Sequence, residues 1–263
     1  MLNTIFATKV GMSQAWSEDG KRLPITKLVV SDNVVLSKKQ TQDGQVTFEI
    51  GYGQKKLKNV KKPLREQIKK SGFSFGVKQV NGVKANEASE TAALAAGATL
   101  ALADVLAVGD VVAIQGLTKG RGFAGAMKRH GFHGGPKTHG QSDRARAVGS
   151  IGAGTTPGRV WKGKRMPGHY GVETKTVSGL VVVYVDQKNN QVWINGPVPG
   201  FNSSVVKISK TGVNKDLKLN LDLLGLKKVE EVAPTAEVIT EVPAEVSAEE
   251  PVVETASSEE SQA

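Results

Sequence analysis

Residues 116–171 constrain the fold of this 263-residue chain most, because they are too basic and too rich in glycine to form part of a hydrophobic core. These 56 residues include 15 glycines and all four histidines, whereas Asp143 is their one acidic residue. A segment with almost no apolar run cannot offset the roughly 1–2 kcal/mol per residue that ordering its backbone costs. We therefore expect a partner to order it, and a polyanion is the obvious candidate.

The distribution of charge along the chain supports an anionic partner. The chain has 35 Lys and Arg against 25 Asp and Glu, but ten of the glutamates lie after residue 228, where no Lys or Arg occurs. The first 228 residues therefore hold 35 basic and 15 acidic side chains, a net charge of +20. This balance is typical of proteins that bind nucleic acids.

Several classes of protein are disfavoured by what the chain lacks. It has no cysteine, which excludes disulfides, thiolate metal sites and a cysteine nucleophile, and fits a reducing compartment. Its first residues lack the apolar run of a signal peptide, and no later segment approaches 18 apolar residues. Its cations lie in a stretch broken by glycines and not along one face of an amphipathic helix. We expect a cytoplasmic protein without a membrane partner.

Short runs of β-branched residues on both sides of residues 116–171 predict strands. Their regular spacing predicts a small barrel or sandwich from which residues 116–171 extend as a long loop, and a loop of that length is unusual unless it is functional. We call residues 116–171 the basic arm. The predicted strands are residues 3–7, 23–30, 34–37, 46–52, 77–80, 110–115, 175–185, 191–194 and 204–208.

Turns and one helix are predicted between these strands. Residues 18–20, 42–44 and 186–190 have the composition of turns, and residues 195–201 that of a loop. Pro63 is expected to start a short helix that Gly72 stops. The alanine-rich residues 92–103 favour a helix by composition, but Gly97 and Thr99 weaken it.

Two segments remain near the C-terminus. Residues 217–226 could form a last strand or a helical turn packed on the body. Residues 229–263 are rich in Glu, Val, Ala, Pro and Ser without any aromatic residue, which predicts a disordered acidic tail. A flexible solubilising extension is the favoured interpretation of this tail, and a shield for the basic body before assembly is the alternative.

Two motifs in the arm have the spacing of nucleotide-binding loops, but their contexts do not fit. Residues 120–125 spell G-x-G-x-x-G after a predicted strand, yet no long helix follows, and Asp143 does not end a strand as the ribose-binding acid would. Residues 158–164 have the spacing of a phosphate-binding P-loop, but Arg165 stands where Ser or Thr must bind magnesium. We therefore expect neither a cofactor nor a small-molecule substrate.

The four histidines of the arm, His130, His133, His139 and His169, are candidate metal ligands. A metal site of this kind usually recruits a thiolate or carboxylate as well, and neither is near. Histidines among Arg and Lys more often bind phosphates or stack on bases, so RNA contact is favoured and no metal is expected. No serine, histidine and acid constellation indicates hydrolysis. The sequence predicts no enzyme.

The arm combines a permissive backbone with many cations, as an RNA-binding extension would. Glycine allows positive φ angles and lets the backbone approach a phosphate chain closely. Neutralising phosphates releases counterions, with a slope of log affinity on log salt of about −0.7 to −0.9 per phosphate. The cations predicted to contact RNA are Lys119, Arg121, Lys128, Arg129, Lys137, Arg144, Arg146, Arg159, Lys162, Lys164 and Arg165.

Single aromatic residues lie among these cations and could stack on unpaired bases. Trp161 and Tyr170 are interpreted in this way. For Phe123 and Phe132, anchoring the loop to a core is an equally good interpretation.

Several blocks of the chain resemble one protein family. They are IFATKVGMSQAW, GKRLPITKL, TKGRGFAGAMKRHGFHGGPKTHG, GSIGAGTTPGRVWKGKRMPGHYG and NGPVPG, in this order over about residues 1–210. They closely resemble the bacterial form of the third protein of the large ribosomal subunit, the universal L-three family. The acidic tail has no counterpart in the family pattern.

The resemblance implies a mainly β fold with an α+β insertion: a small closed β-barrel of the translation-protein type carrying a long basic glycine-rich extension. The body would comprise residues 1–115 and 172–228 with the insertion at about 56–105, the arm residues 116–171, and the tail residues 229–263. Large-subunit rRNA near its 3′ end and neighbouring large-subunit proteins would be the partners, and the protein would be ribosome-bound and help to nucleate subunit assembly.

The resemblance also implies that the arm runs through rRNA toward the peptidyl transferase centre. Its tip, nearest that centre, would be Gly152, Ala153, Gly154, Thr155 and Thr156, which would hold RNA geometry while the RNA performs the chemistry. Some relatives carry a methylated glutamine in this tip; Thr155 takes its place here, so that modification is not expected. A nucleotide-dependent enzyme and a free RNA chaperone remain the alternatives.

Overall fold

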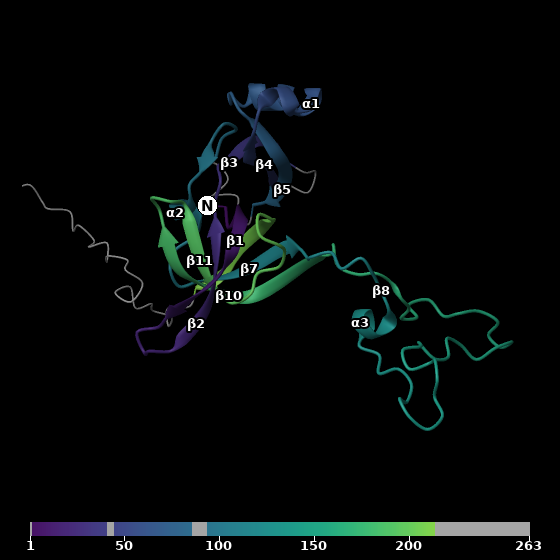
Figure 1. Ribbon diagram of the computed structural model, residues 1–263. Coiled ribbons are helices and arrows are strands. Elements are labelled where there is room, and N and C mark those ends of the chain that lie inside the picture. The colour runs from purple at the N-terminus through teal and green to yellow at the C-terminus, as the bar shows by residue number, and fades with distance from the viewer. Residues whose placement is uncertain (1, 41–44, 86–93, 214–263) are drawn as a thin grey trace, which may run out of the picture. The chain divides into compact units, whose positions relative to one another are not determined.

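The computed structural model describes residues 2–40, 45–85 and 94–213, and most of its regular elements are strands (Figure 1). This confirms the mainly β expectation. The strands are β1 Thr4–Trp16, β2 Arg22–Val29, β3 Asn33–Gln40, β4 Val46–Lys55, β5 Gly76–Lys84, β6 Thr99–Leu100, β7 Asp110–Leu117, β8 Phe123–Ala124, β9 Gly168–His169, β10 Thr174–Asp186, β11 Gln191–Asn195 and β12 Val205–Val213. The helices are a 3-10 turn η1 Leu57–Asn59, α1 Lys62–Lys70, α2 Leu102–Val105 and α3 Ala126–His130.

Six strands form a closed barrel in the order β1-β12-β7-β10-β11-β2, and every neighbouring pair is antiparallel. Alternate apolar residues of these strands point inward, as the two-residue period of a strand requires. Ile5, Leu28, Ile114, Ile194 and Ile208 are fully buried in this core. Because the barrel is closed, each of its six strands has a hydrogen-bonded neighbour on both sides.

A second sheet of order β5-β4-β3-β6 packs against the barrel through β1. While Ile5 faces the barrel core, the next residue, Phe6, turns the other way and stacks on Tyr52 of β4 with ring centroids 4.4 Å apart. The backbone N–H of Phe6 donates to Oδ1 of buried Asn33 (3.1 Å), and Asn33 Nδ2 donates back to Phe6 O (3.0 Å). These contacts fix the second sheet on the barrel wall.

Helix α1 covers one face of the second sheet by burying Ile68 among Val34, Leu36 and Val77. Pro63 occupies the first turn of the helix, and Gly72 just beyond it has φ +85°, as predicted. This sheet includes β3 and β4, which lie before the insertion expected at about residues 56–105.

All nine predicted strands are confirmed, and most run longer than predicted. The largest difference is β1, which was expected to end at residue 7 but continues to Trp16. It does so because it pairs first with β12 and then, past an irregularity between Lys9 and Gly11, with β2. Of the alanine-rich stretch, residues 94–103 form only β6 and the start of α2, so its helix was wrong there. Residues 42–44, 92–93, 217–226 and 229–263 lie outside the described residues.

Candidate nucleic-acid interface

The basic arm begins as a continuation of two neighbouring barrel strands. β7 and β10 pair as far as Leu117 and Thr174. Beyond that pair, Arg121 N donates to Tyr170 O (2.9 Å), and β8 pairs with β9 a little further on. The two ends of the arm therefore run together as a short antiparallel ribbon (Figure 1).

Gly171 lies at a close approach between the two strands of this ribbon. Its φ is +81°, a backbone angle that residues other than glycine rarely adopt. A Cβ at this position would also lie 2.1 Å from Lys119 O. The ribbon can close only because residue 171 has no side chain.

Helix α3 is tied to the returning strand of the arm by two residues that were predicted to contact RNA. Arg129 Nη1 donates to Met166 O (2.9 Å), and His130 Nε2 lies 3.1 Å from the same oxygen. Both side chains are only partly exposed. Gly131 ends the helix in the left-handed conformation. Arg129 and His130 thus have a structural role within the arm, whatever else they bind.

A second close contact lies farther along the arm. Gly135 N donates to Ala145 O (3.1 Å), and a Cβ on neighbouring Gly134 would lie 2.3 Å from that same oxygen. Backbone contacts and glycines therefore order the arm, in place of the apolar side chains that order the barrel.

The other predicted contact residues of the arm leave their charges exposed. Asp143 is the only acid of the arm, and it lies 4.0 Å from the exposed Arg144. Within the described residues no other cation of the arm pairs with a carboxylate. The exposed cations without such a partner are Lys119, Arg121, Lys128, Lys137, Arg146, Arg159, Lys162, Lys164 and Arg165. Arg144 and the histidines His133, His139 and His169 are exposed as well. Such uncompensated positive charge attracts a polyanion.

Two aromatic residues of the arm carry a guanidinium beside the ring. Arg159 lies 5.1 Å from the centre of the Trp161 ring, and Arg121 lies 5.0 Å from that of Tyr170. Trp161 is 59% exposed, so its ring remains accessible for stacking on a base.

The structure separates the two phenylalanines for which the sequence left alternatives. Phe123 is 74% exposed, which disfavours the anchoring interpretation. Phe132 is only partly exposed, and its ring centroid lies 6.1 Å from that of His130. Phe132 therefore fits an anchor within the arm better than Phe123 does.

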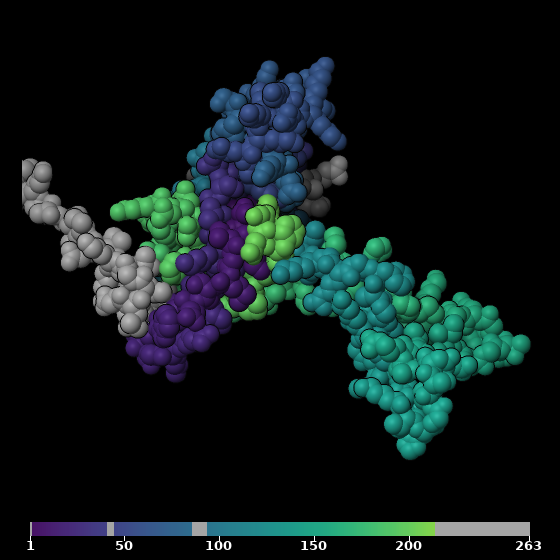
Figure 2. Space-filling model, in the orientation of Figure 1, coloured from purple at the N-terminus to yellow at the C-terminus, as the bar shows by residue number. Residues whose placement is uncertain are grey.

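The predicted tip, Gly152 to Thr156, lies in residues 151–165, every one of which is exposed. The arm is the teal and green part of Figure 2. Ser150 Oγ donates to Gly152 O (2.9 Å), and Gly158 N donates to Gly154 O (3.3 Å). The tip is thus a turn with no charged side chain of its own.

The nucleotide-loop motifs have the contexts expected from the sequence. The last glycine of residues 120–125 caps a helix of only five residues, and the element that follows residues 158–164 is the strand β9. In the described part of the chain, no three His, Asp or Glu side chains gather as they would around a metal ion. No described helix has both the length and the apolar character needed to cross a membrane.

Sequence reasoning missed Lys9, which is 7% exposed. Its ammonium donates to Val198 O (2.7 Å) and Gly200 O (3.1 Å), so it holds the loop between β11 and β12. Burial lowers the pKa of Lys9 below its ordinary value, and the positive charge of Lys119 lowers it further. No local signal distinguishes this lysine in the sequence, because β1 contains other polar residues, among them Thr8, Ser13 and Gln14.

Comparison with known proteins identifies the family. The family model described as "Ribosomal protein L3" matches residues 57–191. A large ribosomal subunit protein uL3 of Dehalococcoides mccartyi is 39% identical over 213 residues, which cover 81% of this chain and all of the relative. The chain belongs to the ribosomal protein L3 family. Proteins of the same name from Persephonella marina and Aquifex aeolicus are 42% and 40% identical, over 79% and 80% of this chain and 89% and 86% of theirs.

The family match covers the whole basic arm and the second-sheet elements that follow β4. The resemblance found in the sequence is thereby confirmed at the level of the family.

Proposed function

We propose that this chain is a structural protein of the large ribosomal subunit that binds large-subunit rRNA through the basic arm. The observation that carries the proposal is an arm of 56 residues whose exposed cations, apart from Arg144, have no carboxylate partner among the described residues. Membership of the ribosomal protein L3 family supports the same function. Most of the affinity would come from counterion release along the phosphate backbone.

The barrel and the arm would divide this function between them. The barrel, of the translation-protein type by resemblance, is closed and packed, so it can act as a fixed anchor at the subunit surface beside neighbouring large-subunit proteins. The arm has little core of its own, so binding RNA would stabilise it. A protein with both parts can join distant RNA segments and so help to nucleate subunit assembly.

The tip, residues 152–156, would lie nearest the peptidyl transferase centre and support its RNA geometry. A turn of small uncharged residues flanked by cations fits a narrow RNA passage, because the flanking charges contact phosphates while the tip occupies little space. The chemistry would belong to the RNA, so we propose no catalytic residue, cofactor or metal. The protein would act in the cytoplasm on the ribosome.

Fractionation of cells that carry a tagged copy tests this function. Lysate is washed in high salt and run on a sucrose gradient, and the large-subunit peak is probed for the tag. About one copy per large subunit after a wash that removes loosely held cationic proteins is the expected result. Recovery only in the soluble fractions would contradict the proposal and favour a free RNA chaperone.

Deleting residues 152–156 tests the role of the tip. Subunits that incorporate the deleted chain but lose peptidyl transferase activity are expected, because the barrel and the other arm cations still bind. Normal activity in such subunits would refute the role of the tip and leave the structural assignment intact.

A further inference from the structure

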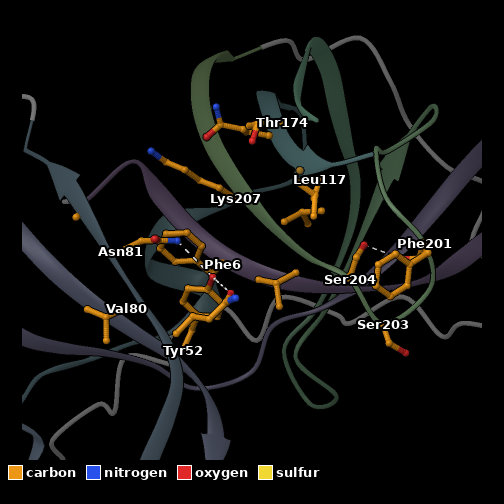
Figure 3. Close-up of a pocket in the computed structure, with 16 residues that line it drawn as sticks. Phe6, Tyr52, Val80, Asn81, Leu117, Thr174, Phe201, Ser203, Ser204 and Lys207 are labelled. Carbon is orange, nitrogen blue, oxygen red and sulfur yellow. Dashed lines mark hydrogen bonds between the residues drawn. The ribbon is translucent and has the colours of Figure 1, made fainter. Parts of the chain in front are cut away.

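A groove of about 770 Å³ lies beside the root of the arm (Figure 3). Phe6, Tyr52 and residues 79–82 of β5 line one side. The other side is lined by the end of β7, the start of β10, Phe201 and residues 203–207. We call it the root groove. Its volume falls within the range of sites that hold small ligands.

The wall formed by the second sheet offers hydrogen-bonding groups above an aromatic stack. The Tyr52 hydroxyl donates to Gln79 Oε1 and accepts a hydrogen bond from Asn81 Nδ2 (3.3 Å). These bonds leave Gln79 Nε2 and Asn81 Oδ1 without a partner among the described residues. An amide donor and an amide acceptor side by side match the edge of a nucleobase.

The opposite wall presents an aromatic ring that is half exposed. Phe201 is 53% exposed and stands across the groove from Tyr52 and Asn81 (Figure 3). Its backbone is held on both sides, because Ser204 Oγ donates to Phe201 O (2.6 Å) and the Lys9 ammonium holds Gly200 O. A ring exposed on a fixed backbone is the platform on which proteins stack unpaired bases.

The charge of the root groove favours an anion. Lys207 is its only charged lining residue among those described, and it forms no ion pair with a described carboxylate. Leu117 and Thr174, which line the same groove, form the last β7–β10 pair at the root of the arm. An RNA strand that follows the arm to its root would therefore reach this groove.

We propose that the root groove binds one unpaired nucleotide of RNA. The base stacks on Phe201, its edge is read by the amides of Gln79 and Asn81, and its phosphate lies near Lys207. This inference rests on the proposed RNA-binding function and extends it from the arm to the barrel.

Ultraviolet crosslinking at 254 nm tests this site in large subunits purified with the tagged full-length chain. After digestion with trypsin and ribonuclease, mass spectrometry is expected to find a nucleotide attached at Phe201. An intact Phe201 without an adduct, or one joined to another protein, would overturn the root-groove site. Adducts on Trp161 in the same sample report separately on the arm, so failure of the groove and failure of the proposed function are distinguishable.

Affinity for transcribed large-subunit RNA provides a second test. Phe201→Ala is expected to weaken binding roughly 5- to 150-fold, the range for loss of one stacked base. Val108→Ala, which shortens a side chain 56% exposed and absent from the groove lining, is the matched control and should bind normally. Circular dichroism should show both variants folded, because neither side chain is buried. Equal affinity of the two variants would refute the proposal.

Discussion

Removal of three exposed charges from the arm should change the salt dependence of RNA binding by a predictable amount. The change is Lys162→Gln, Lys164→Gln and Arg165→Gln in one variant. All three side chains are exposed and lack a carboxylate partner in the described part of the chain, so each is free to neutralise a phosphate. Glutamine keeps a similar length and a polar end, so the variant isolates charge.

The structure sets the size of the effect. The arm has eleven Lys and Arg, of which Arg144 lies beside Asp143 and Arg129 binds Met166 O. The other nine are free to neutralise one phosphate each. At about −0.7 to −0.9 per phosphate, nine cations give a slope of roughly −6 to −8, and the triple variant should lower its magnitude by about 2 to 3. Between 50 and 200 mM salt the natural chain should lose roughly 10⁴-fold or more in affinity, and the variant roughly 10³-fold or less.

Filter binding of transcribed large-subunit RNA at four or more salt concentrations measures this slope. The matched control removes three exposed cations in or beside barrel turns, as Lys21→Gln, Arg22→Gln and Lys188→Gln, and should leave the slope close to that of the natural chain. A triple arm variant with the natural slope would refute the reasoning. An equal change in the barrel control would show that net charge, not the arm, sets the affinity.

Three further predictions concern residues that hold the fold. Gly171→Ala should destabilise the arm ribbon by about 1–3 kcal/mol and increase proteolysis within the arm, because its φ is +81° and its Cβ would meet a carbonyl oxygen. Lys9→Met should lower the free energy of unfolding by about 1–3 kcal/mol in urea, because two loop carbonyls lose their donor. The pKa of Glu49 is lowered chiefly by a hydrogen bond from the Lys39 ammonium. The ionised Glu49 carboxylate therefore stabilises the fold fully above the unfolded pKa of about 4.3, and this stabilisation is lost as pH falls through the lower folded pKa. Glu49→Gln should therefore cost about 0.5–1.5 kcal/mol at pH 7, since the partner lysine is largely exposed, and less at pH 3, measured by urea unfolding.

Each of these predictions has its own control. Gly163→Ala has nearly the same φ, +80°, but its Cβ would meet nothing within 4 Å, so it should be milder than Gly171→Ala. Equal proteolysis of the two variants would show that the contact of the new Cβ with Lys119 O does not cause the effect of Gly171→Ala. Lys188→Met, at an exposed position, should leave the urea midpoint unchanged, and an equal loss there would contradict the role of the Lys9 ammonium. A Glu49→Gln cost that is the same at both pH values would contradict the effect of its ionisation.

The sequence predicted the strands well, because runs of β-branched residues bounded by turns indicate strands regardless of their partners. It did not predict that β1 continues past residue 7, where polar residues and Gly11 interrupt the apolar ones and pairing with β2 keeps the chain extended. For the same reason it missed Lys9, whose role depends on loop carbonyls almost 190 residues away. Long-range pairing has no local signal.

The candidate interface was predicted in composition but not in arrangement. Glycines and cations alone indicated an RNA-binding arm, and the structure places most of those cations in solvent. The sequence could not show that Arg129 and His130 meet at Met166 O, because this contact requires the arm to fold back across more than thirty residues. The root groove was equally out of reach, since segments from both sheets and the arm root build it.

The arm and the root groove would respond differently to salt, and this makes their contributions separable. Counterion release by the arm weakens steeply as salt rises, whereas stacking on Phe201 involves no ion and depends on salt only weakly. At low salt the arm cations should therefore dominate the affinity, and Phe201→Ala should appear as a constant factor at every salt concentration. At high salt, stacking on Phe201 therefore contributes a larger share of the remaining binding free energy. A chain with both contacts would stay bound after a wash that releases proteins held by charge alone.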